Sequence, residues 1–227
     1  MYYSDLVEIY EKLEGTSSKL EKTDIITGFL SKTSSDLLYI VPPLLMGRIF
    51  PDWSSLELGI GPGMLYDAIV FVTGVTKDEL NATVKEEGDI GLAAEKLFMK
   101  KVQSVLFKQR LSLDKVYGNF EKIAGVSGAG AQSRKVKLLS ELLTSASPKE
   151  AKYIARTVLG ELRVGVAEGL VRDAIAQSFK IPKSVVERAY MLTNDFGKVA
   201  HTARMGGENG LKKLSMSVGV PLKPMLA

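Results

Sequence analysis

The chain has no cysteine and a single histidine, His201, among its 227 residues. It can therefore form neither a disulfide framework nor a thiolate metal site, and one imidazole is too few for most histidine-based metal sites or catalysis. Long apolar runs are also missing, since stretches such as Leu37–Met46 are short and interrupted by proline. Such runs cannot span a bilayer, and no basic-then-apolar signal segment opens the chain. We expect a cytoplasmic protein without a metal site of its own.

Acidic residues outnumber basic ones in the first half of the chain, and basic residues outnumber acidic ones in the second half. Residues 1–100 carry 9 Lys/Arg against 16 Asp/Glu, whereas residues 101–227 carry 21 against 10, within a net charge of +4. A basic segment raises the local concentration of phosphate groups and releases counterions when it binds a polyanion. The second half therefore favours a nucleic-acid partner, although an ordinary solvated helical surface has the same composition.

The sequence contains an internal repeat. Sliding Leu58–Ala94 onto Val164–Ala200, an offset of 106 residues, superposes nine identical residues, among them Gly59 on Gly165, Lys77 on Lys183 and Asp89 on Asp195. A spacing this long is not that of a solenoid. A duplicated unit predicts two related lobes, and such a body matches the two related backbones of a DNA duplex.

Helical periodicity recurs almost throughout, while strand-like alternation is scarce. We therefore predict an all-α fold, one compact domain over residues 1–217 built from two pseudo-symmetric lobes of about 1–110 and 111–217. A long helix over Asp89–Gln109 would join them. The Ser147-Pro148-Lys149-Glu150 run predicts a capping box at the start of another helix. The last segment, 218–227, has two prolines and no periodicity, and is typical of a connection to another domain.

A glycine-rich loop followed by basic residues is the most suggestive local pattern. It runs from Ser127 to Lys137 and combines glycines with a predicted helix that Ser133 would cap. Glycines let backbone amides approach a ligand, and unpaired N–H groups at a helix start attract anions. The pattern predicts a phosphate contact, or else a flexible turn before an ordinary surface helix; it lacks the spacing of a P-loop. The candidate residues are Ser127, Gly128, Gly130, Ser133, Arg134, Lys135 and Lys137.

Two further glycine-rich corners are related by the repeat. One contains Gly160, Arg163 and Gly165, and the other contains Gly59, Gly61 and Gly63 without an arginine. Backbone amides at these corners could hold phosphates without reading any base. A tight turn between helices that needs glycine for a positive φ is an equally good interpretation.

A weaker pattern is Gln103-Ser104-Val105-Leu106-Phe107. It is similar to a glutamine-plus-apolar motif that docks proteins onto a sliding clamp, with Gln103, Leu106 and Phe107 as the candidate contacts. The same apolar residues could instead form the buried stripe of an amphipathic helix.

Taken in order, several blocks of the chain resemble the N-terminal DNA-binding domain of archaeal and eukaryotic ATP-dependent DNA ligases. The matching blocks are Leu56–Gly61, Ser127–Gly130 with its basic helix, Ser147–Ile154, Gly160–Gly165 running to Asp173-Ala174, and Pro221–Ala227. The resemblance covers essentially the whole chain. It implies an all-helical domain that sits on the minor groove around a nick and supplies DNA affinity, with residues 218–227 leading into an adenylation domain.

The resemblance does not extend to the catalytic motif of these ligases. Such ligases transfer AMP through a lysine in a Lys-x-Asp-Gly motif, which is absent; the nearest run, Lys115-Val116-Tyr117-Gly118, lacks the aspartate. We therefore expect a chain that binds duplex or nicked DNA without sequence preference and does not seal it. ATP and Mg²⁺ are implied only for a full-length ligase with adenylation and OB-fold domains. The alternative is a helical protein-interaction module that docks a sliding clamp or an acidic partner.

Overall fold

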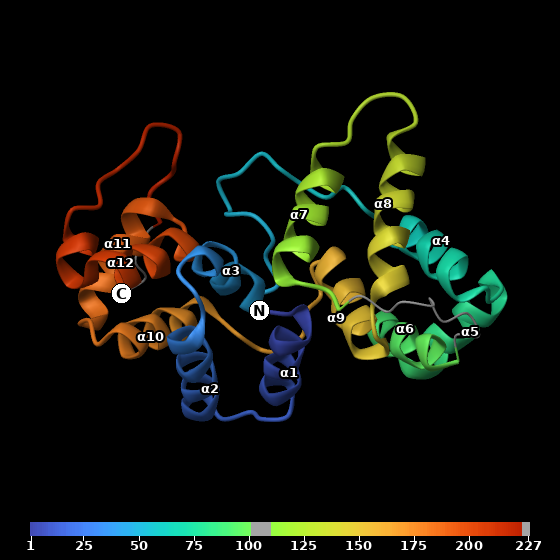
Figure 1. Ribbon diagram of the computed structural model, residues 1–227, viewed down its shortest axis with the longest axis horizontal. Coiled ribbons are helices and arrows are strands. Elements are labelled where there is room, and N and C mark those ends of the chain that lie inside the picture. Colours follow the sequence, from blue (N-terminus) through green and yellow to red (C-terminus); the bar gives the residue numbers. More distant parts are fainter. Residues whose placement is uncertain (101–109, 224–227) are drawn as a thin grey trace. The chain divides into compact units, whose positions relative to one another are not determined.

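The structure, a computed structural model, describes residues 1–100 and 110–223. Over these residues it contains only helices, apart from one isolated bridge between Tyr2 and Ser112, which confirms the predicted all-α class (Figure 1). The elements are α1 (Tyr3–Glu14), α2 (Lys19–Lys32), the 3₁₀ helix η1 (Asp36–Tyr39), α3 (Val41–Leu45), α4 (Pro62–Thr73), α5 (Lys77–Glu87), α6 (Ile90–Met99), α7 (Leu113–Ala124), α8 (Ala131–Ser145), α9 (Pro148–Val158), α10 (Glu168–Phe179), α11 (Lys183–Thr193) and α12 (Phe196–Lys212).

The chain divides into two compact units whose boundaries differ from those of the predicted lobes. One unit comprises residues 1–7 and 56–162, and the other comprises residues 8–55 and 163–227. Each unit therefore combines segments from both halves of the sequence, because α4–α6 pack with α7–α9, and α10–α12 pack with α2, η1 and α3. The two copies of the repeat lie in different units and fold into the same run of three helices.

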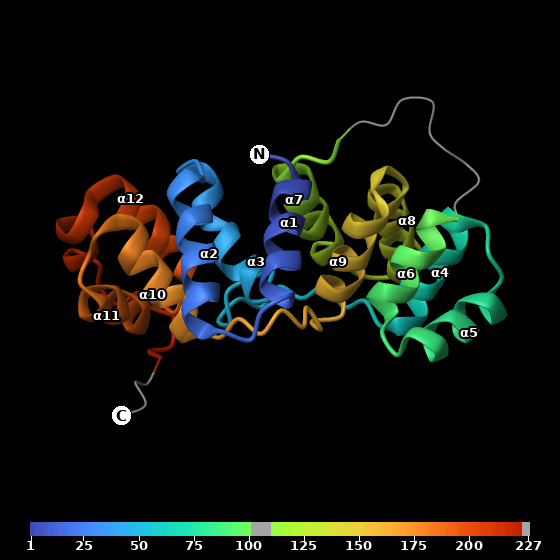
Figure 2. The same ribbon diagram turned by 90° about the horizontal axis from the view of Figure 1, so that it is seen from below.

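The first unit is organised by two helix pairs, α6 with α9 and α4 with α8 (Figures 1 and 2). Between α6 and α9 lies a buried ion pair in which Arg156 Nε donates to Asp89 Oδ1 at 3.0 Å, with both side chains less than a tenth exposed. Asp89 also caps α6 by accepting from the backbone N–H of Leu92 at 2.8 Å. Removing one partner of such a pair leaves a buried charge uncompensated, so the two residues are mutually required.

The second unit is built around the pairing of α2 with α10, visible at one end of Figure 2, and of α12 with η1 and α11. Its apolar core includes Leu30, Leu38, Ile175 and Val199. The hydroxyl of buried Tyr10 donates to the carbonyl oxygen of Leu44 at 2.9 Å, so this large side chain is buried with its polar atom satisfied.

The first two helices in each copy of the repeat end at a residue in the left-handed conformation, but the residue type differs between the copies. Gly74 and Gly88 end α4 and α5 in the left-handed region, and the equivalent positions after α10 and α11 are Lys180 and Asn194, also at positive φ. Glycine adopts this conformation without steric cost, whereas the steric cost is larger for lysine than for asparagine. The common backbone is therefore kept across a change of residue type.

The structure corrects one sequence-based expectation about helices and confirms another. The long helix predicted over 89–109 ends at Met99, because the N–H of Lys100 bonds back to the carbonyls of Leu97 and Phe98; residues 101–109 lie outside the described part. Residues 36–45 form two short elements, η1 and α3, with two prolines at the start of α3. The predicted capping box at Ser147 and Glu150 is confirmed.

Gly91 and Gly197, which the repeat superposes, are both sites of close approach. A Cβ on Gly91 would lie 2.7 Å from Arg156 Cγ, and one on Gly197 would lie only 2.0 Å from the carbonyl oxygen of Tyr39. In each unit the first turn of the third repeat helix thus packs closely against a neighbouring element, against the Arg156 side chain and the Lys152 carbonyl in one unit and against the Tyr39 backbone in the other.

We expect Gly197→Ala to destabilise the protein by about 2 kcal/mol or more, because the new methyl group meets backbone that cannot rotate away. Gly91→Ala should also destabilise the protein, because the new Cβ would lie 2.8 Å from Arg156 Nε, which is paired with Asp89, and 2.9 Å from the carbonyl oxygen of Lys152; its cost should be smaller because these distances exceed the 2.0 Å at Gly197. The matched control is Gly118→Ala within α7, where an added Cβ meets nothing within 4 Å and helix propensity predicts a gain of up to about 1 kcal/mol. Urea unfolding of the three variants checks the order, and equal stability of Gly197→Ala and the parent would contradict it.

Candidate nucleic-acid interface

The predicted glycine loop and basic helix form one exposed structure in the first unit. Gly128 and Gly130 adopt positive φ values of 80° and 72°, and the chain passes through Gly130 directly into α8. The guanidinium of Arg134 donates to the carbonyl oxygens of Ser127 at 2.7 Å and Ala129 at 3.2 Å. The loop is therefore tied to its own helix while its backbone remains at the surface.

Ser133 does not cap α8, contrary to the sequence-based expectation. The N-cap position is Gly130, which has no side-chain cap, and Ser133 lies inside the first turn. The left-handed conformation of Gly130 starts the helix three residues earlier than the predicted boundary.

The two neighbouring lysines of α8 point to different surroundings. The ammonium of Lys135 donates to the carbonyl oxygen of Leu58, within the corner that precedes α4. Lys137 is exposed and lines a pocket. The structure therefore brings the Ser127–Lys137 segment and the Gly59 corner together in the first unit.

The repeated corners have closely similar backbones at their central glycine. Gly59 has a φ of 56° and Gly165 has a φ of 64°, and both are exposed. Arg163, two residues before Gly165, also has a positive φ of 59°. Since a non-glycine residue in this region carries a conformational cost, the turn at Arg163 is imposed by its surroundings. Gly160 ends the turn after α9 at a φ of 71° and belongs to the first unit, whereas Arg163 and Gly165 belong to the second.

Three helices at these corners begin without a side-chain cap. The N-cap residues are Gly61 for α4, Gly130 for α8 and Ala167 for α10. Helices α3 and α11 also lack a side-chain cap, whereas Ser or Thr caps α2, α5, α7 and α9 and Asp caps α6 and α12. An uncapped helix start leaves N–H groups available to an anion and places the positive end of the helix dipole beside it. Gly63 lies in the first turn of α4 and is exposed.

A cluster of charges lies beside the start of α10 in the second unit. Glu168 Oε1 accepts from Lys223 Nζ at 2.8 Å and from Arg48 Nη1 at 3.1 Å, and both cations also contact Asp52. Burial acts to raise the pKa of Glu168, but the hydrogen bonds from Lys223 and Tyr190 and the nearby positive charges outweigh it, so that the pKa is lowered. Lys223 thereby attaches the segment that follows α12 to the unit.

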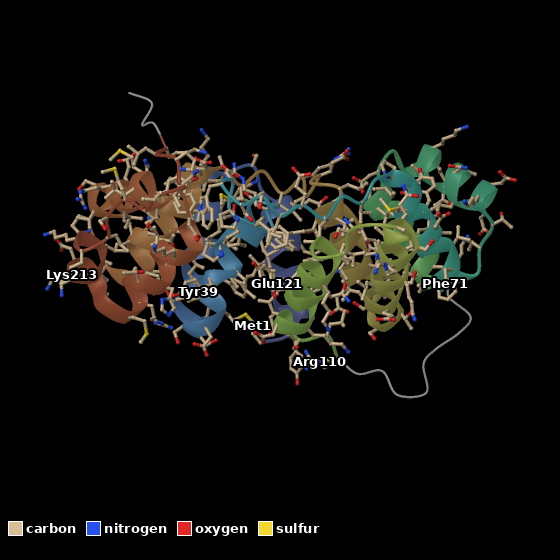
Figure 3. All side chains as sticks on the ribbon, turned by 90° about the horizontal axis from the view of Figure 1, so that it is seen from above. Met1, Tyr39, Phe71, Arg110, Glu121 and Lys213 are labelled. Atoms are coloured by element: carbon tan, nitrogen blue, oxygen red, sulfur yellow. The ribbon has the colours of Figure 1, made fainter. Side chains whose placement is uncertain are left out.

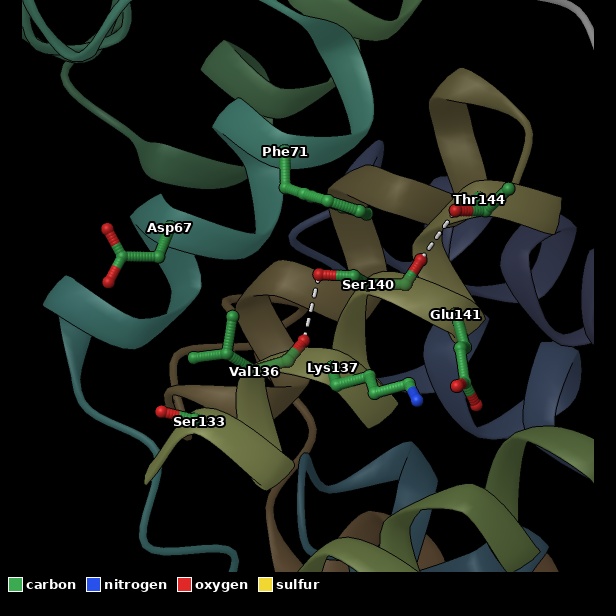
Figure 4. Close-up of a pocket in the computed structure, with 8 residues that line it drawn as sticks. All are labelled: Asp67, Phe71, Ser133, Val136, Lys137, Ser140, Glu141 and Thr144. Carbon is green, nitrogen blue, oxygen red and sulfur yellow. Dashed lines mark hydrogen bonds between the residues drawn. The ribbon is translucent and has the colours of Figure 1, made fainter. Parts of the chain in front are cut away.

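A cavity of about 570 Å³ opens between α4 and α8 in the first unit (Figure 4). Phe71 stands at its edge with 77% of its surface exposed, and its side chain is also at the surface in Figure 3. The hydroxyls of Ser140 and Thr144 donate to carbonyl oxygens of their own helix, at 2.8 Å and 2.7 Å. The exposed surface of the cavity wall is mainly apolar. Because these two hydroxyls are already bonded to backbone carbonyls, neither is paired with a base as a nucleophile would be.

Asp67 and Asp173, equivalent in the repeat, each pair with the equivalent lysine. Lys77 Nζ lies 2.6 Å from Asp67 Oδ1, and Lys183 Nζ lies 2.7 Å from Asp173 Oδ2. Within residues 1–100 and 110–223 no group of three or more His, Asp or Glu side chains could hold a metal ion. In the same residues no helix is both long and apolar enough to cross a membrane. The candidate clamp contacts Gln103, Leu106 and Phe107 lie outside the described part of the chain.

Sequence reasoning missed one residue of these corners, Lys22. Its side chain is 7% exposed, and its ammonium donates to the carbonyl oxygen of Val164 at 2.6 Å. Lys22 lies 142 residues from Val164 and outside the repeated segments, so no local pattern marks it. A lysine on the otherwise apolar face of α2 was the only available signal.

The sequence of the chain is similar to those of known proteins. A family model described as DNA ligase N terminus matches residues 2–176. DNA ligases from Methanothermobacter thermautotrophicus, Thermococcus onnurineus and Archaeoglobus fulgidus are 50%, 48% and 42% identical to the chain over its whole length. The chain spans only about 40% of the length of each of these relatives.

The lowered pKa of Glu168 predicts an acid-sensitive contribution to stability. Because the folded-state pKa lies below that of the unfolded chain, the contribution is complete above pH of about 4.5 and is lost as the pH falls through the folded-state value. Glu168→Gln should therefore lower the free energy of unfolding by at most about 1 kcal/mol at pH 7, and the difference from the parent should be smaller at pH 3. Urea unfolding at both pH values tests this, with Asp24→Asn, an exposed carboxylate on α2, as the control.

Proposed function

The chain belongs to the DNA ligase N-terminal family, and from this premise we propose that it binds duplex DNA, nicked or intact, through the sugar–phosphate backbone along the minor groove. The observation that carries the proposal is the coincidence of exposed glycine corners with uncapped helix starts at α4, α8 and α10. Contacts of this kind are made to phosphates, which carry no sequence information. Binding without sequence preference is the consequence.

The charges of the chain support the same interface. Arg134 and Lys137 are exposed on the first turns of α8, directly after the glycine loop. The second half of the chain, which contains this loop and the Arg163 corner, holds 21 of the 30 basic residues. Cations clustered beside free amides raise affinity for a polyanion by releasing its counterions. The proposed contact residues are Ser127, Gly128, Gly130, Ser133, Arg134, Lys135, Lys137, Gly160, Arg163, Gly165, Gly59, Gly61 and Gly63.

In a full-length ligase such a domain would supply DNA affinity to the enzyme. The reacting groups, ATP and Mg²⁺ would then be held by the adenylation and OB-fold domains of that ligase. Nick sealing is accordingly proposed for the longer protein and not for these 227 residues.

Substituting both exposed cations, Arg134→Ala with Lys137→Ala, should weaken binding to every duplex alike. Loss of one or two phosphate contacts reduces the slope of log K against log salt by about one to two. Fluorescence anisotropy with labelled nicked and intact duplexes at several salt concentrations measures both quantities. The double variant Lys85→Ala with Lys115→Ala, which removes the same charge from the exposed faces of α5 and α7, should leave the slope nearly unchanged. An unchanged slope in the first variant would remove this helix from the interface.

Arg163→Gly separates the guanidinium from the turn that carries it. Glycine adopts the observed φ of 59° without steric cost, so the free energy of unfolding should change by less than about 1 kcal/mol. DNA affinity should fall about tenfold through loss of one charged contact. Thermal unfolding and anisotropy on the same samples provide the test, and a large loss of stability with unchanged affinity would make Arg163 a structural residue.

A second candidate function is docking of a protein partner on the first unit. The mainly apolar cavity beside exposed Phe71 favours it, because such a surface is more suited to a protein side chain than to a phosphate. Sequence-independent, steeply salt-dependent binding of duplex supports the first proposal. Binding of a sliding clamp by a chain that fails to bind duplex would support the second.

A further inference from the structure

The same lysine contact recurs beneath both repeated corners. In the first unit, the ammonium of Lys135 on α8 donates to the carbonyl oxygen of Leu58. In the second, the ammonium of Lys22 on α2 donates to the carbonyl oxygen of Val164 at 2.6 Å and to that of Gly165 at 3.3 Å. Leu58 and Val164 are equivalent in the repeat, whereas the two lysines lie outside it. Each unit thus reaches the same contact from a different part of the sequence.

The glycine after each bonded carbonyl is what admits the lysine. A Cβ on Gly59 would lie 2.9 Å from Lys135 Nζ, and a Cβ on Gly165 would lie 2.6 Å from Lys22 Nζ. Both glycines also have positive φ, which a side chain would strain. Glycine is therefore favoured by the backbone conformation at each corner, and a Cβ there would also displace the ammonium from its position.

The contact determines where the next amide points. In a trans peptide the C=O and the N–H of one peptide unit point in opposite directions, and the described chain contains no cis peptide bond. Drawing the Leu58 carbonyl inward onto Lys135 therefore turns the N–H of Gly59 outward. By the same geometry, Lys22 turns the N–H of Gly165 outward. Both glycines are exposed, so each N–H is directed at the surface.

We propose that Lys22 and Lys135 are positioning residues for DNA binding: each ammonium holds a backbone carbonyl so that the adjacent glycine N–H faces a phosphate of the duplex. This inference rests on the proposed function. It also reassigns Lys135, because its ammonium acts on the protein backbone and the glycine amide meets the phosphate.

Positioning and direct contact differ in their salt dependence. A lysine that neutralises a phosphate releases a counterion, and its removal lowers the salt slope by about one. Removal of a lysine that bonds only to the protein lowers the affinity for DNA without changing the salt slope. Lys135→Met and Lys22→Met should each reduce affinity for a labelled duplex about tenfold at fixed salt while the slope stays within about 0.3 of the parent value. The matched controls are Lys85→Met on α5 and Lys213→Met, each of which replaces an exposed lysine.

The glycine amides themselves provide the second readout. In ¹⁵N–¹H correlation spectra of the 227-residue chain, duplex should shift the amide resonances of Gly59 and Gly165 strongly, and the shift at Gly59 should be lost in Lys135→Met. Lys135→Arg, which keeps a charged donor, should restore most of the affinity and the shift. Circular dichroism confirms that each variant is folded. Because Lys135 is only partly buried, its variants decide the matter if Lys22→Met does not fold.

The outcomes separate this inference from the function on which it rests. If the parent binds duplex but the two glycine amides do not shift, or if folded Lys135→Met binds as the parent does, the positioning role is overturned and DNA binding stands. A slope lowered by about one in Lys135→Met overturns it as well, because the lysine then contacts phosphate directly. If the parent does not bind duplex, the proposed function and the inference fail together.

Discussion

The contact between a lysine ammonium and the carbonyl before a glycine organises each of the two units. It lies at the end of a helix pair, α4 with α8 in one unit and α10 with α2 in the other, and joins the helix that carries the lysine to the corner that starts its partner. A buried ammonium is costly unless its protons are bonded. Here backbone carbonyls bond it, and glycine leaves the space it needs. The exposed amides of the corner are therefore a consequence of how the helix pair is closed.

The two copies of the repeat reach similar backbones by different chemistry. In the first unit, the third helix is held by the buried Asp89–Arg156 pair and by the contact of Gly91 with Arg156. In the second, Gly197 lies directly on the carbonyl of Tyr39, with no arginine at that contact. Gly91 and Gly197, and the caps Asp89 and Asp195, are the same in both copies because the backbone around them needs a small residue and a cap. The partner residues differ because any group that fills the space and satisfies the polar atoms serves equally well.

The structure shows the surroundings of the predicted site residues and changes the local role of two of them. The loop at Ser127–Gly130 and the corners at Gly59 and Gly165 are exposed, as a binding surface requires. Ser133 does not cap, and the ammonium of Lys135 turns toward Leu58. Both differences arise from the start of α8: its left-handed Gly130 moves the helix boundary, and the boundary sets which direction each side chain of the first turn takes.

The sequence alone determined the all-α class, most helix positions, the repeat and the family resemblance, because these depend on local periodicity, capping residues and the order of short motifs. Only the tertiary structure decided that each unit combines both halves of the chain, and that Lys22 meets a corner 142 residues away. Such pairings depend on which apolar faces bury one another and which buried charge finds a carbonyl. Those choices are made in three dimensions, and no window of the sequence contains them.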